Sequence, residues 1–421
     1  MKIIIQRPRA LENNRYSFHV SACLLVVAIF AASYLLLAGK VLSQPAPLSH
    51  SPLPPASSTR LGVILPLSGR YAAFGEQALK GILLAADTFG TTFELNKGLS
   101  LEIIVKDTKD DPLASERAVE ELAADKDVMG IIGPLLSVTA MGAARKAQEL
   151  KLPIITLSQK QGLTGAGDYV FRNFLVPAEQ AKAIADYAIN KLNCIKFAIL
   201  YPDSTYGIEL ANSFKEEIKK GNGIVAAEEQ YKEGQTYFGK EVVRLFKIKE
   251  TEKKEGRRLV KTFETTVAVD ALYIPDYFDI IGLIAPHLAY YNVKDVKLLG
   301  ANGWNSPKLV ELAGKYVEGA VFTDGFFTGS KREAVSRFTN DFKNLYGTEP
   351  GIIAAQAYDA TRMMAEAVLS GNGKRDEARN YLANLKKFRG VTGDIAFDSN
   401  REATKELFIL SVKKGQIVEI N

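Results

Sequence analysis

The stretch LGVILPLSGRYAAFGEQALKGILLAAD, residues 61–87, decides the fold of this 421-residue chain. It opens with the apolar run LGVIL and continues through a polar loop that contains Ser68 and Gly69. Apolar residues then recur at the three- and four-residue spacing of an amphipathic helix. The pattern predicts a buried strand, a loop and a helix. In an open α/β sheet, the loop at the carboxyl end of a parallel strand is where ligands bind.

The same alternation of strand and helix patterns continues along the chain. The candidate strands are residues 61–65, 101–105, 128–132, 153–156, 197–201, 271–274, 297–299 and 320–323. Most of them precede a helix-patterned stretch, which predicts parallel sheets joined by right-handed crossovers. The last 30 residues differ, because IAFDSN, ELFILSVKK and QIVEI predict short strands joined by turns.

An apolar run with a basic flank opens the chain. Four basic residues precede positions 20–38, which carry no charge, and a largely apolar run of 19 residues is long enough to span a bilayer. We therefore expect residues 1–43 to be a cleaved signal peptide or an uncleaved membrane anchor, and both place the globular part outside the cytoplasm. Residues 44–59, QPAPLSHSPLPPASST, contain five prolines and predict an extended linker.

The charge balance argues against nucleic-acid binding. Residues 1–43 contain five basic residues and one acidic residue, so they carry four of the five net positive charges of the chain. The remainder is nearly neutral and lacks the clustered basic side chains that nucleic acid requires. One densely charged stretch, KIKETEKKEGRRLVKT at residues 247–262, mixes both signs. It predicts a solvated helix or loop extension, with a partner-docking insert as the alternative.

Residues for catalysis or metal binding are scarce. Beyond the linker the chain has one histidine, His287, and one cysteine, Cys194. This count allows no disulfide within the fold and no histidine-rich metal site, and Cys194 is expected to be buried and unreactive. Asp107, Asp110 and Asp111 fall in the loop VKDTKDDP, where they are expected to serve as turn residues and a helix cap. We expect no enzyme activity, no metal and no cofactor.

Several segments, in order, resemble the type I periplasmic binding proteins, the branched-chain amino-acid-binding group. The matching segments are residues 61–87 and GIIGPLLSVTAMGAARKAQELKLPIITLSQ (130–159) for the ligand loops, YVFRNFLVPAEQAKAIADYAI (169–189) for a crossover, and ILYPDSTYGIELANSFKEEI (199–218) for the opening of the second lobe. Residues 274–293 and 298–327 resemble the branch of this family called penicillin-binding protein activators.

The resemblance implies a fold class and a division of the chain. The fold is α/β with two lobes, each a parallel sheet flanked by helices, and the ligand binds in a cleft between the lobes. Lobe one is expected to comprise residues 60–176 and 326–392. Lobe two is expected to comprise residues 177–325 and 393–421, so that three crossovers join the lobes.

The resemblance also implies a set of ligand-binding residues in the strand-end loops. They are Ser68, Phe74, Ser137, Thr139, Ser158 and Gln159 in lobe one, and Tyr206, Asp276, Tyr277 and Asn302 in lobe two. The Ser137 hydroxyl and the nearby helix-start amides are expected to hold an anionic group. Trp304 either stacks on the ligand or is an apolar anchor before the helix that begins at Pro307.

Two residues depart from the amino-acid binders of the family. Lys160 stands where they place a hydroxyl residue, and Asn302 stands where they place an acidic one. Lysine has only donors and asparagine carries no charge, so neither stabilises a ligand ammonium group as a carboxylate would. A buried ammonium without such a partner is penalised by several kcal/mol. A neutral or anionic ligand, or no ligand, therefore fits better than an α-amino acid.

These features predict a non-enzymatic extracytoplasmic solute receptor of an ABC transporter, with a non-standard ligand. The alternative is an envelope regulator that binds and activates a penicillin-binding protein in peptidoglycan synthesis. The expected partners are a small molecule in the interlobe cleft and either an ABC permease or a penicillin-binding protein. Membrane contact is expected only through the N-terminal segment.

Overall fold

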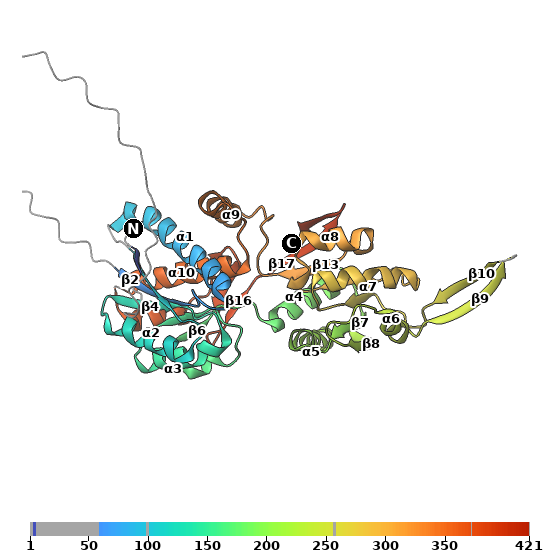
Figure 1. The fold of residues 1–421 in the computed structure, drawn as a ribbon, viewed down its shortest axis with the longest axis horizontal. Coiled ribbons are helices and arrows are strands. Elements are labelled where there is room, and N and C mark those ends of the chain that lie inside the picture. Colours follow the sequence, from blue (N-terminus) through green and yellow to red (C-terminus); the bar gives the residue numbers. More distant parts are fainter. Residues whose placement is uncertain (1–2, 6–58, 98–100, 256–257, 372, 421) are drawn as a thin grey trace, which may run out of the picture.

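Two lobes lie side by side along the long axis of the molecule (Figure 1). The computed structural model describes residues 3–5, 59–97, 101–255, 258–371 and 373–420. Apart from residues 3–5 and Thr59, the predicted signal or anchor (1–43) and linker (44–59) lie outside these ranges. Among the helices that the structure describes, none combines the length and the apolar character that crossing a membrane requires.

The first lobe is built on a six-stranded parallel sheet in the order β1-β3-β2-β4-β5-β6. Its strands are β1 (Ile3–Ile5), β2 (Thr59–Leu65), β3 (Leu101–Asp107), β4 (Val128–Ile132), β5 (Ile154–Thr156) and β6 (Val170–Arg172). The central strands are apolar along their whole length because helices cover both faces of the sheet. The strand, loop and helix predicted for residues 61–87 are confirmed as β2, a loop and the start of α1.

Helices pack on both faces of this sheet. The helices of the lobe are α1 (Ala72–Lys97), α2 (Pro112–Ala124), α3 (Ser137–Glu149), α9 (Glu333–Tyr346), α10 (Ile352–Ser370), α11 (Arg375–Ala383) and the short η1 (Leu163–Ala166). α1 and α10 share one hydrophobic core with the sheet, whereas α2 and α3 form a separate core on the other side. This sandwich buries Val63 and Ile64, neighbours that face opposite sides of the sheet, completely.

The second lobe is built on a seven-stranded sheet in the order β18-β17-β13-β12-β11-β7-β8. This sheet is mixed rather than wholly parallel as predicted, because β17 runs antiparallel to β13 and β18 runs antiparallel to β17. Its strands are β7 (Lys196–Pro202), β8 (Ile224–Tyr231), β11 (Ala271–Tyr273), β12 (Lys297–Gly300), β13 (Val321–Asp324), β17 (Phe408–Lys413) and β18 (Gln416–Glu419). The helices are α4 (Pro177–Asn190), α5 (Thr205–Lys220), α6 (Gly239–Phe246), α7 (Phe278–Tyr290) and α8 (Pro307–Ala313), with the short η2 (Asn302–Trp304) and η3 (Gly314–Val317). α4 and α5 cover one face, and α6, α7 and α8 cover the other.

A small antiparallel sheet places part of the C-terminal region on the first lobe. It consists of β14 (Phe388–Gly390), β15 (Gly393–Phe397) and β16 (Ala403–Lys405). Phe397 packs its ring 5.0 Å from Phe171 of β6, and Glu402 forms a backbone bridge with Arg172. The chain therefore returns to the second lobe after Lys405, later than the predicted boundary at residue 393. Side-chain packing, rather than strand pattern, decides this boundary.

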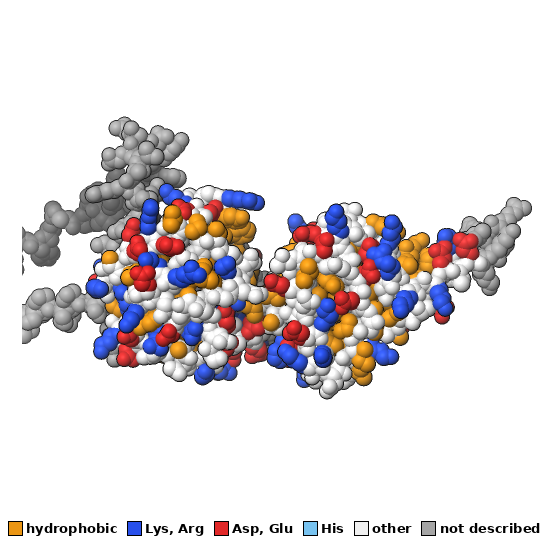
Figure 2. Space-filling view, turned by 90° about the horizontal axis from the view of Figure 1, so that it is seen from below, with side chains coloured by type: hydrophobic (Ala, Val, Ile, Leu, Met, Phe, Trp, Pro, Cys, Tyr) orange, Lys and Arg blue, Asp and Glu red, His pale blue; other side chains and the backbone are white. Residues whose placement is uncertain are grey.

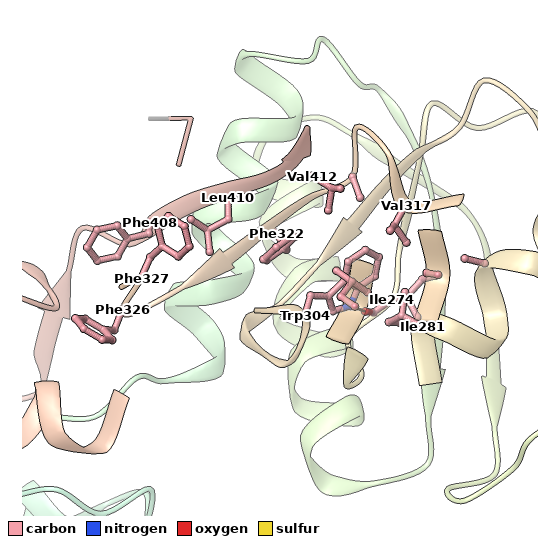
Figure 3. Close-up of a cluster of buried hydrophobic side chains, with 14 of the residues drawn as sticks. Ile274, Ile281, Trp304, Val317, Phe322, Phe326, Phe327, Phe408, Leu410 and Val412 are labelled. Carbon is pink, nitrogen blue, oxygen red and sulfur yellow. Dashed lines mark hydrogen bonds between the residues drawn. The ribbon is translucent and has the colours of Figure 1, made fainter. Parts of the chain in front are cut away.

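The three crossovers run from β6 to α4, from β13 to α9 and from β16 to β17. An apolar cluster extends through this region from the second lobe toward α1 and α10. In Figure 3, Phe326, Phe327 and Phe408 lie together at one end of the cluster, and Trp304 and Ile281 lie at the other. The connection between the lobes therefore consists of packed apolar side chains as well as the three backbone crossovers.

The charged stretch at residues 247–262 forms a β-hairpin, so the predicted helix or loop extension is wrong. Its strands, β9 (Lys249–Glu255) and β10 (Arg258–Glu264), pair antiparallel and project from the end of the second lobe (Figure 1). Lys261 forms ion pairs with Glu250, and with Glu252 directly opposite. Cross-strand pairing of opposite charges favours a strand pair over a helix.

Charges of both signs cover the face of the molecule seen in Figure 2. Lysine and arginine side chains alternate with aspartate and glutamate side chains on both lobes. That face shows no basic patch of the kind that nucleic-acid binding requires.

Candidate ligand-binding site

Three of the predicted second-lobe residues come together at the carboxyl ends of neighbouring strands. Tyr206 follows β7, Tyr277 follows β11 and Asn302 follows β12, and these strands are adjacent in the sheet. The Tyr206 hydroxyl donates a hydrogen bond to Asn302 Oδ1 at 2.8 Å. The rings of Tyr206 and Tyr277 stack with centroids 5.1 Å apart and an interplanar angle of 18°. The sequence therefore located a real cluster of polar and aromatic side chains.

The orientation of the Asn302 amide follows from its neighbours. The Tyr206 hydroxyl donates to Asn302 Oδ1, and burial raises the pKa of this hydroxyl well above its ordinary value, so it keeps the proton that it donates. The Asn302 backbone N–H donates to Gln180 Oε1 of α4 at 3.0 Å, and Gln180 is buried. Within the part of the chain that the structure describes, Asn302 Nδ2 has no hydrogen-bond partner. The amide thus presents its NH₂ end for further bonding.

Asp276 holds the loop that carries Tyr277 in place through two hydrogen bonds. The Tyr231 hydroxyl donates to Asp276 Oδ2 at 2.6 Å, and the Tyr277 backbone N–H donates to Oδ1 at 2.7 Å. Burial raises the pKa of Asp276, although both hydrogen bonds act in the opposite direction. A Cβ on Gly303 would lie 2.7 Å from the Asp276 carbonyl oxygen, so the close approach of the two loops requires glycine there. Asp276 therefore positions the loop, and sequence reasoning missed its partner Tyr231.

In the first lobe, Ser68 and Phe74 flank the loop between β2 and α1. The Ser68 hydroxyl donates to Asp107 Oδ2 at 2.6 Å, and the Leu67 N–H donates to Asp107 Oδ1 at 2.9 Å. Partial burial acts to raise the pKa of Asp107, but these hydrogen bonds and that from the Lys109 N–H hold it below its ordinary value. Ser68 therefore fixes the loop to β3. Phe74 keeps 46% of its surface exposed.

Ser137 and Thr139 lie in the first turn of α3. Thr139 is buried, and its hydroxyl donates to the Leu136 carbonyl at 3.1 Å, so it stabilises the helix start. Ser137 is only half-buried, and the Leu136 cap supplies no side-chain hydrogen bond to this end of the helix. Of this pair, Ser137 is the side chain that a ligand can reach.

Ser158 and Gln159 follow β5, and a residue absent from the predicted set holds them in place. The buried Ser158 Oγ accepts the Lys160 N–H at 3.2 Å. Arg172 Nη1 donates to the carbonyl oxygens of Gln159 at 3.1 Å and Lys160 at 3.2 Å. The Arg172 Nε also pairs with Glu402 at 2.5 Å. Arg172 comes from β6, and no local pattern in the sequence connects it with this loop.

A groove of about 690 Å³ opens beside Asn302, between second-lobe loops and the start of α10 in the first lobe. Its lining residues are Asn302, Asn305, Pro307, Val310, Glu311, Asp324, Phe326, Phe327, Thr328, Gly329, Pro350, Gly351, Ile352, Gly415, Gln416 and Ile417. Only Asn302 among them belongs to the predicted set. Asp324 accepts hydrogen bonds from Asn305 Nδ2 at 2.7 Å and the Gly325 N–H at 2.6 Å. Burial raises the pKa of Asp324 to about 7.

Trp304 is an apolar anchor, so its alternative role of stacking on a ligand is wrong. The side chain is fully buried, and its Nε1–H donates to the Ile274 carbonyl at 3.0 Å. Its ring lies against Phe322 in the second-lobe core (Figure 3). The predicted helix start after it is confirmed, because Ser306 caps α8 by accepting the Lys308 N–H.

The remaining reactive side chains are packed into the fold. Cys194 is buried as predicted, and burial raises the pKa of its thiol. His287 places its ring 4.9 Å from Tyr237, with Nδ1 2.8 Å from the Leu283 carbonyl oxygen. The described ranges contain no group of three or more histidine, cysteine, aspartate or glutamate side chains that could hold a metal ion.

Comparison with known proteins places this geometry in a family. Residues 58–247 and 269–416 match the family model described as periplasmic binding protein, and the gap between these ranges contains the β9–β10 hairpin. The chain is 23% identical to the Leu/Ile/Val-binding protein BraC3 of Rhizobium johnstonii, over 89% of this chain and 96% of that protein. It is 24% identical to Leu/Ile/Val-binding protein homolog 3 of Brucella melitensis, over 63% of this chain and 66% of that protein.

Solved structures of transporter proteins have a similar fold. A putative branched-chain amino acid ABC transporter protein from Rhodospirillum rubrum superposes with a TM-score of 0.76 at 25% identity, over 86% of this chain and all of that one. The substrate-binding protein LivJ from Streptococcus pneumoniae, in complex with isoleucine, gives a TM-score of 0.58 at 26% identity over the same shares. The family match and these solved structures, together with two sheets that are each covered by helices on both faces, show that this chain belongs to the periplasmic binding protein family and has the two-lobed α/β fold of its type I members.

Proposed function

We propose that this protein is the solute receptor of an ABC transporter, that it acts outside the cytoplasm without catalysing a reaction, and that its ligand is not a standard α-amino acid. The observation that carries the proposal is the cluster of Tyr206, Tyr277 and Asn302 at three adjacent strand ends. It combines a half-exposed aromatic ring with a polar group that lacks a partner, which is the usual make-up of a small-molecule site.

The site has its second half on the first lobe. Ser137 and the loop at Ser158 to Lys160 lie at the carboxyl ends of β4 and β5, where open α/β sheets bind ligands. A ligand that contacts both halves draws the lobes together by rotation about the three crossovers. An ABC permease is the proposed partner of the closed form, and the N-terminal segment is proposed to direct export.

The amino-acid specificity of the named relatives does not transfer directly. Those relatives are Leu/Ile/Val-binding proteins, and one structure contains isoleucine. Here Lys160 and Asn302 occupy the positions where the amino-acid binders supply acceptors for the ligand's ammonium group. None of the relatives described above is a penicillin-binding protein activator, and no contact in the structure favours that function.

Small-angle X-ray scattering tests the proposal on the purified full chain. A library of amino acids, organic acids, sugars and polyols is first screened by thermal shift, and each stabilising compound is then added at saturation. We expect at least one compound to lower the radius of gyration. The double variant Tyr277→Ala, Asn302→Ala should lose both the thermal shift and the compaction. Saturable binding with an unchanged radius, or no stabilising compound at all, would contradict the receptor function.

A further inference from the structure

Three carboxylates around the site have hydrogen-bond donors of their own. Asp107 accepts from Ser68 and two backbone N–H groups, and Asp276 accepts from Tyr231 and the Tyr277 N–H. Asp324, in the groove beside Asn302, accepts from Asn305 and the Gly325 N–H. Asp276 and Asp324 are also each only 7% exposed. Burial therefore restricts the access of a ligand ammonium to Asp276 and Asp324, whose oxygens already accept internal hydrogen bonds.

Three groups in the two halves of the site have unused donor capacity. Tyr206 occupies Asn302 Oδ1, which leaves the Nδ2 hydrogens. Lys160 follows Ser158 at the end of β5; its N–H and C=O are bonded, and within the described residues its ammonium group has no ion pair or hydrogen bond. The start of α3 adds N–H groups that lack a side-chain cap, next to the hydroxyl of Ser137. Each of these donors requires an oxygen acceptor on the ligand.

The apolar surface beside these donors is aromatic. Tyr277 is 51% exposed although its ring stacks on Tyr206, so one side of the ring is available to a ligand. Phe74 on the first lobe is 46% exposed. A ligand with an apolar or aromatic body between two oxygen-bearing ends matches this distribution of surface.

We propose that the ligand is an apolar organic acid with an oxygen acceptor, in place of an ammonium group, next to its carboxylate: a 2-oxo or 2-hydroxy acid. This proposal rests on the receptor function proposed above and names the ligand class of that site. Asn302 Nδ2 donates to the oxygen on carbon 2. The first-lobe donors, which are Ser137, the N–H groups at the start of α3 and the Lys160 ammonium group, bind the carboxylate. Tyr206 is a positioning residue, because its hydroxyl fixes which end of the Asn302 amide faces the ligand.

Two matched sets of compounds that differ only at carbon 2 test the proposal. The first set is 4-methyl-2-oxopentanoate, 2-hydroxy-4-methylpentanoate and leucine, and the second is phenylpyruvate, phenyllactate and phenylalanine. Titration calorimetry on the full chain should show the oxo or hydroxy acid of at least one set binding about 100-fold or more tightly than its amino acid, because the amino acid leaves the Asn302 amide donor in the occupied site without an acceptor. Comparing the oxo acid with the hydroxy acid in each set shows whether the site prefers a carbonyl oxygen or a hydroxyl oxygen on carbon 2.

Two variants separate this specificity from general damage to the site. Asn302→Asp supplies an acceptor, so the preference for the acid over the matched amino acid should fall at least about tenfold. Tyr206→Phe frees the Asn302 amide to rotate. The ratio of the affinity for the acid to that for the matched amino acid should therefore fall, while the variant still binds the acid. Tyr290→Phe, on the exposed end of α7, is the matched control and should leave the preference unchanged.

The outcomes are distinct. Tighter binding of leucine or phenylalanine than of their oxygen analogues would overturn the proposed ligand class and leave the receptor function standing. An unchanged preference in Asn302→Asp would remove Asn302 from the role assigned to it and would also overturn the proposal. Silence of all six compounds would overturn it as well, and the broader scattering screen then decides the receptor function separately.

Discussion

Asp324 is a carboxylic acid enclosed at the connection between the lobes, and its titration makes stability depend on pH. Its pKa is raised from 3.8 to about 7 because burial disfavours the charged form. Between pH 4 and 7 the folded protein holds a proton that the unfolded chain releases, so the free energy of unfolding should fall as pH rises through this range. The expected loss at this one residue is on the order of 2–4 kcal/mol.

Urea unfolding at several pH values between 4 and 8 measures this loss. Asp324→Asn cannot ionise, so its free energy of unfolding should lack that part of the decline seen in the parent protein. Asp295→Asn, at an exposed position before β12, should show the parental pH dependence. Parallel curves for the parent protein and Asp324→Asn would show that Asp324 is not the group responsible.

At the scale of elements, one arginine joins three segments of the first lobe. Arg375 begins α11, and its Nη2 donates to the carbonyl oxygens of Ala123 at 3.1 Å and Asp125 at 2.8 Å. Its Nε donates to the Val128 carbonyl at 2.9 Å. These acceptors lie at the end of α2 and the start of β4, where the helix leaves carbonyl groups without partners. α11 thus satisfies the helix end through a single side chain.

Replacing this arginine should destabilise the fold without touching the proposed site. Arg375→Met leaves three carbonyl groups without their donor, and we expect a loss of about 2–3 kcal/mol in the free energy of unfolding. Arg375→Lys should recover only part of it, because one ammonium group cannot span the three acceptors. Arg389→Met, at an exposed position in β14, is the control. Equal stabilities of Arg375→Met and Arg389→Met in urea would refute the assignment.

The β9–β10 hairpin is expected to be dispensable for folding. Its base is anchored by Phe263, whose ring lies 5.1 Å from that of Tyr291 and whose carbonyl accepts from Asn292. Replacing residues 251–262 by Asn-Gly keeps this base and closes the shortened strands with a tight turn. The free energy of unfolding should change by less than about 1 kcal/mol. A loss above about 3 kcal/mol would show that the arm contributes to the core.

For the whole molecule, stability should not depend on metal ions or disulfides. Cys194 is the one cysteine in the ranges that the structure describes, and no metal-binding cluster occurs there. Apolar burial in both lobes therefore has to supply the stability. We expect the melting temperature to be the same with and without a chelator, and with and without a reductant. A fall of many degrees with either reagent would contradict this.

The connection between the lobes, about which closure is proposed, is also a property of the whole molecule. Glu179 of α4 accepts the Lys405 N–H at 3.0 Å, so a second-lobe helix contacts the last strand of the first lobe. The Lys405 ammonium donates to the hydroxyl of Thr392 at 3.2 Å, and Thr392 lies in the turn between β14 and β15 on the first lobe. These contacts, together with the packed phenylalanine side chains, join the two lobes near the first and third crossovers, about which the proposed closure would rotate.

The sequence by itself determined the local units of this protein. Apolar runs predicted the central strands, because strands that are buried on both faces of a sheet are apolar along their length. Helical spacing of apolar residues predicted α1. Asp111 caps α2 by accepting the Leu113 N–H, and Ser306 caps α8, both as expected from capping residues next to proline. The resemblance located Tyr206, Tyr277 and Asn302, because strand-end loops keep their order along the chain.

Only the tertiary structure decided which distant residues hold these loops. Arg172 and Glu402 are 230 positions apart, and Tyr231 and Asp276 are 45 apart, so neither pair leaves a periodic signal in the sequence. The hairpin depends on cross-strand pairing of charges, and the return to the second lobe after Lys405 depends on the packing of Phe397. Local sequence patterns predict burial and helix caps, because both depend on residues close together in the chain. Contacts between distant residues form only when the elements of the lobes pack, so no local pattern predicts them.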